Sequence, residues 1–303
     1  MTEMGFCVTG GDGIYGKLAR FCVRSIRIQY PNAPIVVCIP ADERQSVPLP
    51  SDVIVRSIEL PLEDYGFITK VCTLTRAERE LDVRPLCLLD SDVLVTDQLS
   101  IPPSGYEFAA KPADCGWEWG IGRESTWEYL YDEFGLSLPE ASIRSTTGGK
   151  GIWPFYNAGV VVSNVPRFGE RWLELTAALR SEEGEIGETI YADQMALGML
   201  STEYDVLALE ERQNYPLGLR YIVPGGLEVI HYHDPRNLLK APRYRGLLQE
   251  VGILEYLPFT WSDPRILPWA MKHLYRTSWW RKECWIAERD PESVFAASSK
   301  VGN

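Results

Sequence analysis

The sequence predicts an α/β protein with a mostly parallel sheet, and the alternation of two kinds of segment carries this prediction. Short runs at residues 5–9, 35–39 and 86–89 are apolar at consecutive positions, which is typical of strands buried on both faces. Residues 15–30 and 68–81 have helical spacing. Strands that alternate with helices predict right-handed βαβ units, in which ligands bind beyond the carboxyl ends of the strands.

Length and charge limit the classes of protein to which the chain can belong. The chain has 303 residues, which suits one large domain or two unequal ones. We expect residues 1–240 to form the main domain and residues 241–303, rich in Trp and Arg, to form a helical appendage. The formal net charge of −12 argues against non-specific binding to nucleic acid, which needs a basic surface.

The cysteines and the hydropathy pattern predict a compartment. The seven cysteines are odd in number and include no Cys-x-x-Cys pair, so we expect a reducing compartment without a disulfide framework or a structural zinc site. No signal peptide is visible, and no stretch approaches the ~20 apolar residues that a spanning helix needs. We therefore expect a cytoplasmic protein, either soluble or peripheral to a membrane.

The most informative motif is Asp90-Ser91-Asp92, which lies between the apolar runs 86–89 and 93–95. Unpaired carboxylates are costly to bury, and coordination of a cation is a common remedy. Oxygen ligands favour a hard divalent ion such as Mn²⁺ or Mg²⁺, and a cation held by few protein groups keeps positions open for a diphosphate. The alternative interpretation is an acidic turn between two strands.

A glycine-rich loop joins the first predicted strand to the first predicted helix. It contains Thr9, Asp12 and Tyr15, and its glycines would let the backbone approach a ligand closely. The helix start offers free N–H groups, but the loop has neither the phosphate-loop nor the dinucleotide-binding order of glycines. A tight strand-to-helix turn explains it equally well.

Two further elements carry polar groups suited to a sugar. Asn157-Ala158-Gly159 opens an apolar strand, so the amide could donate to hydroxyl groups while the two small residues leave room for a ligand. Asp193 and Gln194 open an apolar helical segment and would contact a sugar ring if they point inward. The alternatives are a turn-forming Asn and two solvated side chains.

Two histidines lie at the end of a late strand predicted over residues 227–231. Neutral imidazole is a good ligand for Mn²⁺, so His231 or His233 could complete a metal site. Alternate residues of a strand point to opposite faces, so we expect only one of the two to bind. The alternative is a histidine of the core.

Taken in order, these elements resemble the GT-A glycosyltransferases, and most closely glycosyltransferase family 8, the glycogenin and bacterial galactosyltransferase group. The resemblance runs over residues 7–234 and includes Lys70, on the helix before the acidic strand. It implies a Rossmann-like, mostly parallel sheet flanked by helices. It also implies a hexosyltransferase that uses Mn²⁺ and a nucleotide-sugar donor, most often a UDP-sugar. The acceptor would be a glycan or another hydroxyl compound, and transfer would retain the anomeric configuration.

The resemblance also implies roles for particular residues. Asp90, Asp92 and His231 would hold the metal, and Asn157, Asp193 and Gln194 would act around the transferred sugar. The residues expected to bind the donor and its metal are Thr9, Asp12, Tyr15, Lys70, Asp90, Ser91, Asp92, Asn157, Ala158 and Gly159.

The chain departs from the family after the late histidine. The family usually continues with Gly and then Lys-Pro-Trp, which close over the diphosphate. Here Tyr232-His233-Asp234 follows, and Arg236 or Lys240 would have to substitute.

Three alternatives stay open on the sequence alone. An inverting enzyme would need a carboxylate base, for which Asp114, Glu118 and Asp132 are candidates. A sugar-1-phosphate nucleotidyltransferase would also use carboxylate-held Mg²⁺ in an α/β sheet. A non-catalytic binding or scaffolding protein could use residues 269–282 as an interfacial helix at an anionic membrane, although the same residues suit a helix packed on the domain.

Overall fold

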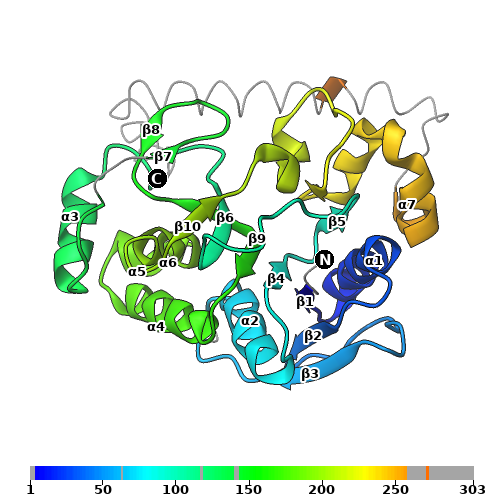
Figure 1. The fold of residues 1–303 in the computed structure, drawn as a ribbon, viewed down its shortest axis with the longest axis horizontal. Helices are drawn as coiled ribbons and strands as arrows, with labels where there is room; N and C mark the ends of the chain where they lie inside the picture. The colour runs from blue at the N-terminus through cyan, green and yellow to red at the C-terminus, as the bar shows by residue number, and fades with distance from the viewer. Residues whose placement is uncertain (1–3, 63, 117–118, 140–142, 258–270, 273–303) are drawn as a thin grey trace, which may run out of the picture.

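A mixed seven-stranded sheet forms the centre of the computed structural model, which describes residues 4–62, 64–116, 119–139, 143–257 and 271–272 (Figure 1). In spatial order the strands are β10 (Val206–Ala208), β6 (Phe108–Pro112), β9 (Tyr156–Ser163), β4 (Leu86–Leu89), β1 (Gly5–Thr9), β2 (Ile35–Pro40) and β3 (Ile54–Ile58). β1 to β4 run parallel to one another, whereas β9 runs antiparallel to both β4 and β6. The predicted mostly parallel sheet is therefore confirmed, with β9 as the reversed strand.

Helices cover both faces of this sheet because its central strands are apolar on both sides. In β1, the side chains of Phe6 and Val8 pack with residues of α1 (Gly13–Gln29), whereas Cys7 points to the opposite layer. That layer contains α2 (Ile68–Glu80), α4 (Phe168–Ser181) and α6 (Ala192–Leu200). The remaining helices are α3 (Glu124–Glu133), α5 (Glu185–Glu188) and α7 (Arg245–Val251).

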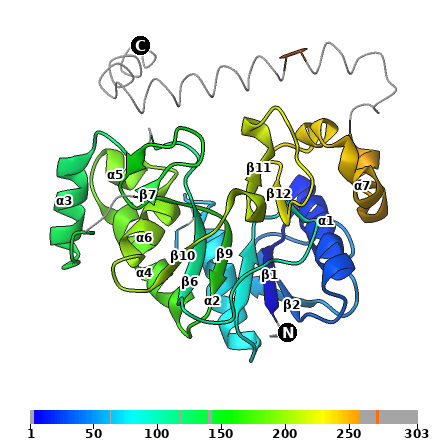
Figure 2. The same ribbon diagram turned by 45° about the horizontal axis from the view of Figure 1, so that its top comes forward.

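A second, three-stranded sheet lies beside α1 (Figure 2). Its strands are β11 (Tyr215–Pro216), β12 (Val229–His231) and β5 (Val93–Val95), and β12 is the central one. The chain leaves the main sheet at the end of β4, turns through Asp90–Asp92 and enters the second sheet as β5. Because β5 pairs antiparallel with β12, Val93 lies opposite His231. This register places the late histidine next to the acidic turn.

Short connections complete the described fold. β7 (Ile143–Arg144) and β8 (Gly151–Ile152) form a small hairpin. The 3₁₀ segments are η1 (Glu211–Gln213), η2 (Leu217–Leu219), η3 (Pro235–Lys240), η4 (Pro242–Tyr244) and η5 (Ile253–Tyr256).

The C-terminal part of the described chain packs on α1. Leu248 and Val251 of α7 share an apolar cluster with Leu18 and Phe21 of α1. The boundary predicted at residue 240 stays a prediction, and of the segment 269–282 only residues 271–272 lie within the described chain. Among the described residues, no helix combines the length and apolar character needed to cross a membrane.

The expectation of a chain without a disulfide framework is not met at Cys115, which is disulfide-bonded. The other described cysteines are free and buried in the core, where their thiols pack as small apolar groups: Cys7, Cys22, Cys38, Cys72 and Cys87.

Candidate functional site

The backbone fixes the acidic turn between the two sheets. The Asp90 N–H donates to the Gly159 carbonyl at 2.9 Å, and the Tyr232 N–H donates to the Asp92 carbonyl at 3.1 Å. Asp90 is thus tied to β9 of the main sheet and Asp92 to the residue that follows β12 of the second sheet. The two carboxylates are held in place by strands and do not lie on a loose acidic loop.

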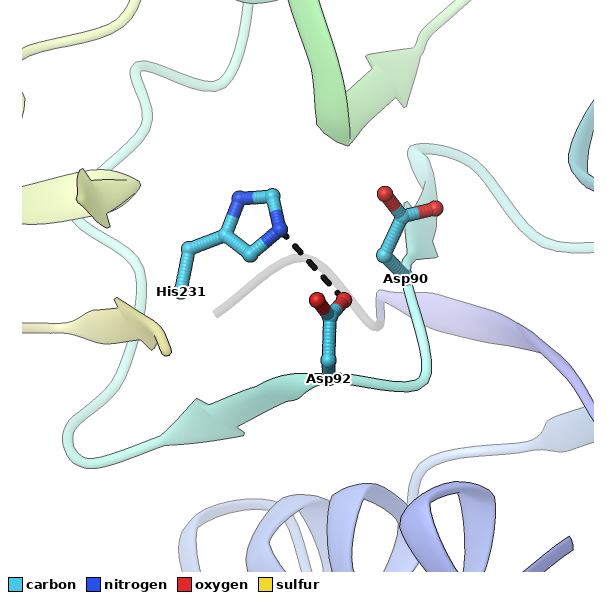
Figure 3. A group of neighbouring side chains, drawn as sticks. All are labelled: Asp90, Asp92 and His231. Atoms are coloured by element: carbon cyan, nitrogen blue, oxygen red, sulfur yellow. Dashed lines mark ion pairs between the residues drawn. The ribbon is translucent and has the colours of Figure 1, made fainter. Parts of the chain in front are cut away.

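Asp90, Asp92 and His231 form a compact group of oxygen and nitrogen ligands (Figure 3). One ligand atom from each lies within 4.8 Å of the others, and His231 Nε2 lies 3.3 Å from Asp92 Oδ1. Burial opposes ionisation of Asp92, but the positive charge of the His231 ring in its protonated form outweighs burial and holds the pKa of Asp92 well below its usual range. Two carboxylates and an imidazole suit Mn²⁺, and the residues present therefore fit a divalent cation.

His231 and not His233 belongs to this group. The expectation that the two rings would point to opposite faces of a strand is wrong, because β12 ends at His231. His233 has a left-handed backbone with φ of 58°, which turns its ring back onto His231. The two rings stack with centroids 3.9 Å apart, and His233 is exposed and lines the cleft described below. His233 therefore packs against the ring of the candidate ligand and does not join the group.

Lys70 of α2 links the acidic turn to α6. Its Nζ lies 2.9 Å from Asp90 Oδ2 and 3.6 Å from Asp193 Oδ2. Burial would lower the pKa of Lys70, but the charges of Asp90 and Asp193 raise it above its usual value, so the ammonium stays charged. Asp193 is almost fully buried and also accepts a hydrogen bond from the Tyr65 hydroxyl at 2.8 Å.

A cleft of about 490 Å³ opens onto these groups. It is lined by most of the predicted sugar and metal residues, namely Lys70, Asp90, Asp92, Asn157, Ala158, Gly159, Gln194 and His231. Asp193 and Ser91 do not line it, and the buried carboxylate of Asp193 acts through Lys70 and Tyr65.

The predicted nucleoside residues lie outside this cleft, at the carboxyl end of β1. The Thr9 hydroxyl contacts the Thr73 hydroxyl at 3.3 Å, and the Asp12 N–H donates to Glu43 at 2.8 Å. Tyr15 is 61% exposed, which leaves its ring open to a ligand. Because β1 and β4 are neighbours in the sheet, Thr9, which ends β1, lies beside the end of β4 that Asp90 follows.

Asp114 forms part of the cleft wall, and its environment limits its chemistry. Its Oδ1 accepts hydrogen bonds from the buried ammonium of Lys111 at 2.5 Å and from the Thr146 hydroxyl at 2.6 Å. Although burial opposes ionisation, Lys111 lowers the pKa of Asp114, which makes it a weak base. Asp132 lies on α3 and does not line the cleft, while Glu118 lies outside the described residues.

The two cations that were expected to replace the missing phosphate clamp are engaged elsewhere. Arg236 pairs with Asp234, two residues before it. Lys240 donates from Nζ to the carbonyl groups of Leu217 and Gly218. Neither residue lines the cleft.

Sequence reasoning missed Tyr65 and Asn214. Tyr65 holds Asp193, and Asn214 contacts both Asn157 and His231. Neither residue belongs to a motif, and both are brought to the site by contacts between distant parts of the chain. The only signal in the sequence is the polar run that precedes β11, in which an Asn is unremarkable.

Comparison with known proteins adds a family and a fold. The family model described as the Rhodobacterales glycosyltransferase domain matches residues 53–205. No functionally curated protein matches the sequence. Among solved structures, the bifunctional glycosyltransferase WbbM shares 15% identity and a TM-score of 0.50, over 91% of this chain and 52% of WbbM.

Two other structures are similar at lower TM-scores. The galactosyltransferase LgtC, solved with donor and acceptor sugar analogues, shares 14% identity over 86% of this chain and 99% of LgtC, with a TM-score of 0.45. The glycosyltransferase GlyE of Streptococcus pneumoniae TIGR4 shares 18% identity over 84% of this chain and 62% of GlyE, with a TM-score of 0.49. This chain thus spans about half of WbbM and less than two thirds of GlyE.

Proposed function

The chain belongs to the Rhodobacterales glycosyltransferase family, and on that premise we propose that it transfers a sugar from a nucleoside-diphosphate donor to a hydroxyl acceptor with the help of a divalent cation. The proposed donor is a UDP-sugar and the proposed cation is Mn²⁺ or Mg²⁺. The proposed ligands are Asp90, Asp92 and His231. The acceptor would be a glycan or another hydroxyl compound.

One observation carries this proposal: the three candidate ligands converge at the carboxyl ends of the strands and line the same cleft as the polar residues suited to a sugar. Asp90 and Asp92 come from the turn after β4, whereas His231 comes from β12, more than a hundred residues later. An acidic turn of no functional importance would need no imidazole, and it would not need to face a cleft. Ligands in open α/β sheets bind at this edge.

A cation held there would supply positive charge against the two phosphates of the donor and so assist departure of the nucleoside diphosphate. The residues of the chain position the donor. Lys70 presents an ammonium at the cleft, fixed between Asp90 and Asp193. Asn157 and Gln194 line the same wall with amide groups that can bond to sugar hydroxyls. Ala158 and Gly159 line the cleft beside them.

Transfer with retention is the stereochemical outcome that we propose. An inverting enzyme needs a carboxylate base near the acceptor hydroxyl. Among the described residues, Asp114 lines the cleft, but its carboxylate is already bound by Lys111 and Thr146. Asp234 also lines the cleft, and its carboxylate is paired with Arg236. Attack from the face of the leaving group would let a diphosphate oxygen take the proton of the acceptor, so no protein base would be required.

Substitution of Asp92 tests the proposal directly. Asp92→Asn keeps the shape of the side chain but removes the negative charge and the pairing with His231 Nε2. Release of nucleoside diphosphate from a panel of nucleotide sugars with Mn²⁺ should fall by at least about 100-fold. The melting temperature should stay close to that of the wild type.

Asp97→Asn is the matched control, because Asp97 is exposed beyond the other end of β5. It should retain wild-type activity. Full activity of the purified Asp92→Asn variant would refute the metal site. Release of pyrophosphate from a nucleoside triphosphate, without cleavage of any nucleotide sugar, would replace the proposed reaction with nucleotidyl transfer.

A further inference from the structure

We propose that Asn214 is a positioning residue that determines which nitrogen of His231 carries the proton, through hydrogen bonds that begin at the backbone of Gly159. The inference rests on the proposed function, since its consequence is that His231 presents Nε2 to the cation. Four groups take part: the Gly159 N–H, the amides of Asn157 and Asn214, and the imidazole of His231.

The first hydrogen bond fixes the orientation of Asn157. The Gly159 N–H donates to Asn157 Oδ1 at 2.9 Å. A backbone N–H can only donate, so the oxygen of the Asn157 amide, and not its nitrogen, must face Gly159. Amide groups can usually be built in either of two orientations, but here the backbone decides between them.

This orientation passes to Asn214 and then to His231. Asn214 Nδ2 donates to the same Asn157 Oδ1 at 2.9 Å, which turns the Asn214 oxygen toward His231. Asn214 Oδ1 lies 3.1 Å from His231 Nδ1. Because this oxygen can only accept, Nδ1 must be the nitrogen that carries a proton. The Gly159 N–H therefore fixes the orientation of both amides, and the Asn214 amide in turn fixes the proton on Nδ1 of His231.

The consequence appears at the other nitrogen of the ring. With the proton of a neutral imidazole on Nδ1, Nε2 keeps its lone pair, and it points at Asp92 Oδ1 from 3.3 Å. Two lone pairs at this distance repel each other unless a positive charge lies between them. A divalent cation supplies that charge, and Nε2 is then a ligand whose other nitrogen is held by an outer partner, as is usual for metal-binding histidines.

Burial and strand pairing hold Asn214 in place. Asn214 is fully buried and His231 is 5% exposed, so bulk water does not compete for their hydrogen bond. Asn214 follows η1, which is closed by reciprocal hydrogen bonds between Glu210 and Gln213. It precedes β11, in which Pro216 pairs with His231. The amide is thus delivered by the strand next to the histidine.

Moving the His231 proton to Nε2 would require the amides of Asn214 and Asn157 to turn over, which is unfavourable. An Nε2 proton would point at Asp92, which favours the opposite tautomer. That tautomer would require Asn214 to turn over, and its oxygen would then face the oxygen of Asn157. Turning Asn157 as well would leave the buried Gly159 N–H without an acceptor, which destabilises that arrangement. Replacing Asn214 with an apolar residue removes the hydrogen bond that holds the proton on Nδ1 and leaves Asp92 as the hydrogen-bonding partner of the ring.

The test reads the tautomer in the metal-free protein by ¹⁵N NMR of the histidine rings, at a pH where His231 is neutral. Wild-type His231 should carry its proton on Nδ1. Asn214→Leu should move the proton to Nε2, and Asn214→Ala carries the same expectation if the leucine variant does not fold. Asn214→Asp keeps an acceptor toward the ring and should keep the proton on Nδ1. Asn164→Leu, the same change at an Asn bonded to the Tyr106 carbonyl, is the control.

Mn²⁺ affinity without donor gives a second readout. It should fall by about 10- to 100-fold in Asn214→Leu and should not weaken in Asn214→Asp or Asn164→Leu. A leucine or alanine variant that keeps the Nδ1 proton and wild-type Mn²⁺ affinity would overturn the inference. The two proposals fail separately. A wild-type protein that does not bind Mn²⁺ would refute the proposed function, whereas the position of the His231 proton is still measured by NMR in the metal-free protein.

Discussion

Gly159 shows how one small residue shapes the site. A Cβ built at this position would lie 2.3 Å from His231 Cε1 and 2.6 Å from its Nδ1. The ring of His231 therefore packs directly on the backbone of β9, and no larger residue fits between them. The sequence indicated that Ala158 and Gly159 leave room for a ligand. In the structure, the space beside Gly159 is filled by a candidate metal ligand.

Gly159→Ala should therefore displace His231. We expect the free energy of unfolding to fall by about 1–3 kcal/mol and Mn²⁺ affinity to fall with it, because the ring cannot stay in place beside a methyl group. Denaturant unfolding and Mn²⁺ titration would measure the two effects. Gly66→Ala is the control, since a Cβ there meets nothing within 4 Å. Wild-type Mn²⁺ affinity in Gly159→Ala would show that the packing of this ring does not matter for binding.

Asp114 gives a prediction about acid stability. Its pKa in the folded protein lies below its usual value of 3.8, since Lys111 outweighs the effect of burial. The unfolded chain then binds this proton more readily, so the stabilisation is present above pH 3.8 and is lost as the pH falls through the folded-state pKa. Asp114→Asn should be less stable than the wild type by about 3–5 kcal/mol at pH 5, because Lys111 is left buried without a counter-ion.

The gap between Asp114→Asn and the wild type should shrink as the pH falls below 3.8. Urea unfolding of both proteins at pH 5 and pH 3 would measure it, and other titrating groups cancel in the comparison. A gap of equal size at both pH values would mean that the carboxylate does not act through its charge.

At the scale of elements, the site depends on the step of the chain from one sheet to the other. The apolar runs that became β1, β2 and β4 were predicted because both of their faces are buried, and the helix predicted over residues 68–81 is α2, which ends one residue earlier at Glu80. The pairing of β5 with β12 could not be predicted, since it joins segments far apart in the chain. The antiparallel direction of β9 was equally inaccessible.

Local patterns also explain which site residues were found. The carboxylates, the small residues of β9 and Lys70 could be found through the resemblance of their motifs to a known family. Tyr65 and Asn214 carry no such signal and act through partners on other elements. The prediction for His233 was wrong for a specific reason: its left-handed backbone breaks the alternation of side chains between the two faces that a strand imposes.

Lys70 ties α2 to α6, and its removal should be costly. Lys70→Met leaves Asp193 buried without a cation, for an expected loss of about 3–5 kcal/mol in unfolding free energy. The double variant Lys70→Met/Asp193→Asn should recover part of that loss, since no buried charge remains unpaired there. Lys17→Met is the control, because the ammonium of Lys17 lies near the surface over the Tyr256 ring, and it should cost less than about 1 kcal/mol. A double variant less stable than Lys70→Met would contradict the pairing.

At the scale of the whole molecule, the predicted GT-A fold and the assignment as a transferase are confirmed. The family match covers residues 53–205, so it includes Asp90, Asp92 and Asn157 but neither β1 nor His231. The proposed metal site therefore joins matched and unmatched parts of the chain. Under the proposed function, a cation at Asp90, Asp92 and His231 would offset the repulsion between a diphosphate and a chain with a net charge of −12.

The most direct test is a thermal-shift screen of nucleotide sugars with Mn²⁺ and with EDTA. A ligand at 100 times its Kd stabilises the folded state by about 2.7 kcal/mol, which is readily seen as a rise in Tm. We predict that one donor, a UDP-sugar, raises the Tm only when Mn²⁺ is present, and that Asp92→Asn abolishes the rise. Equal stabilisation in EDTA, or by none of the nucleotide sugars, would contradict the claim that Asp90, Asp92 and His231 bind the donor through a cation.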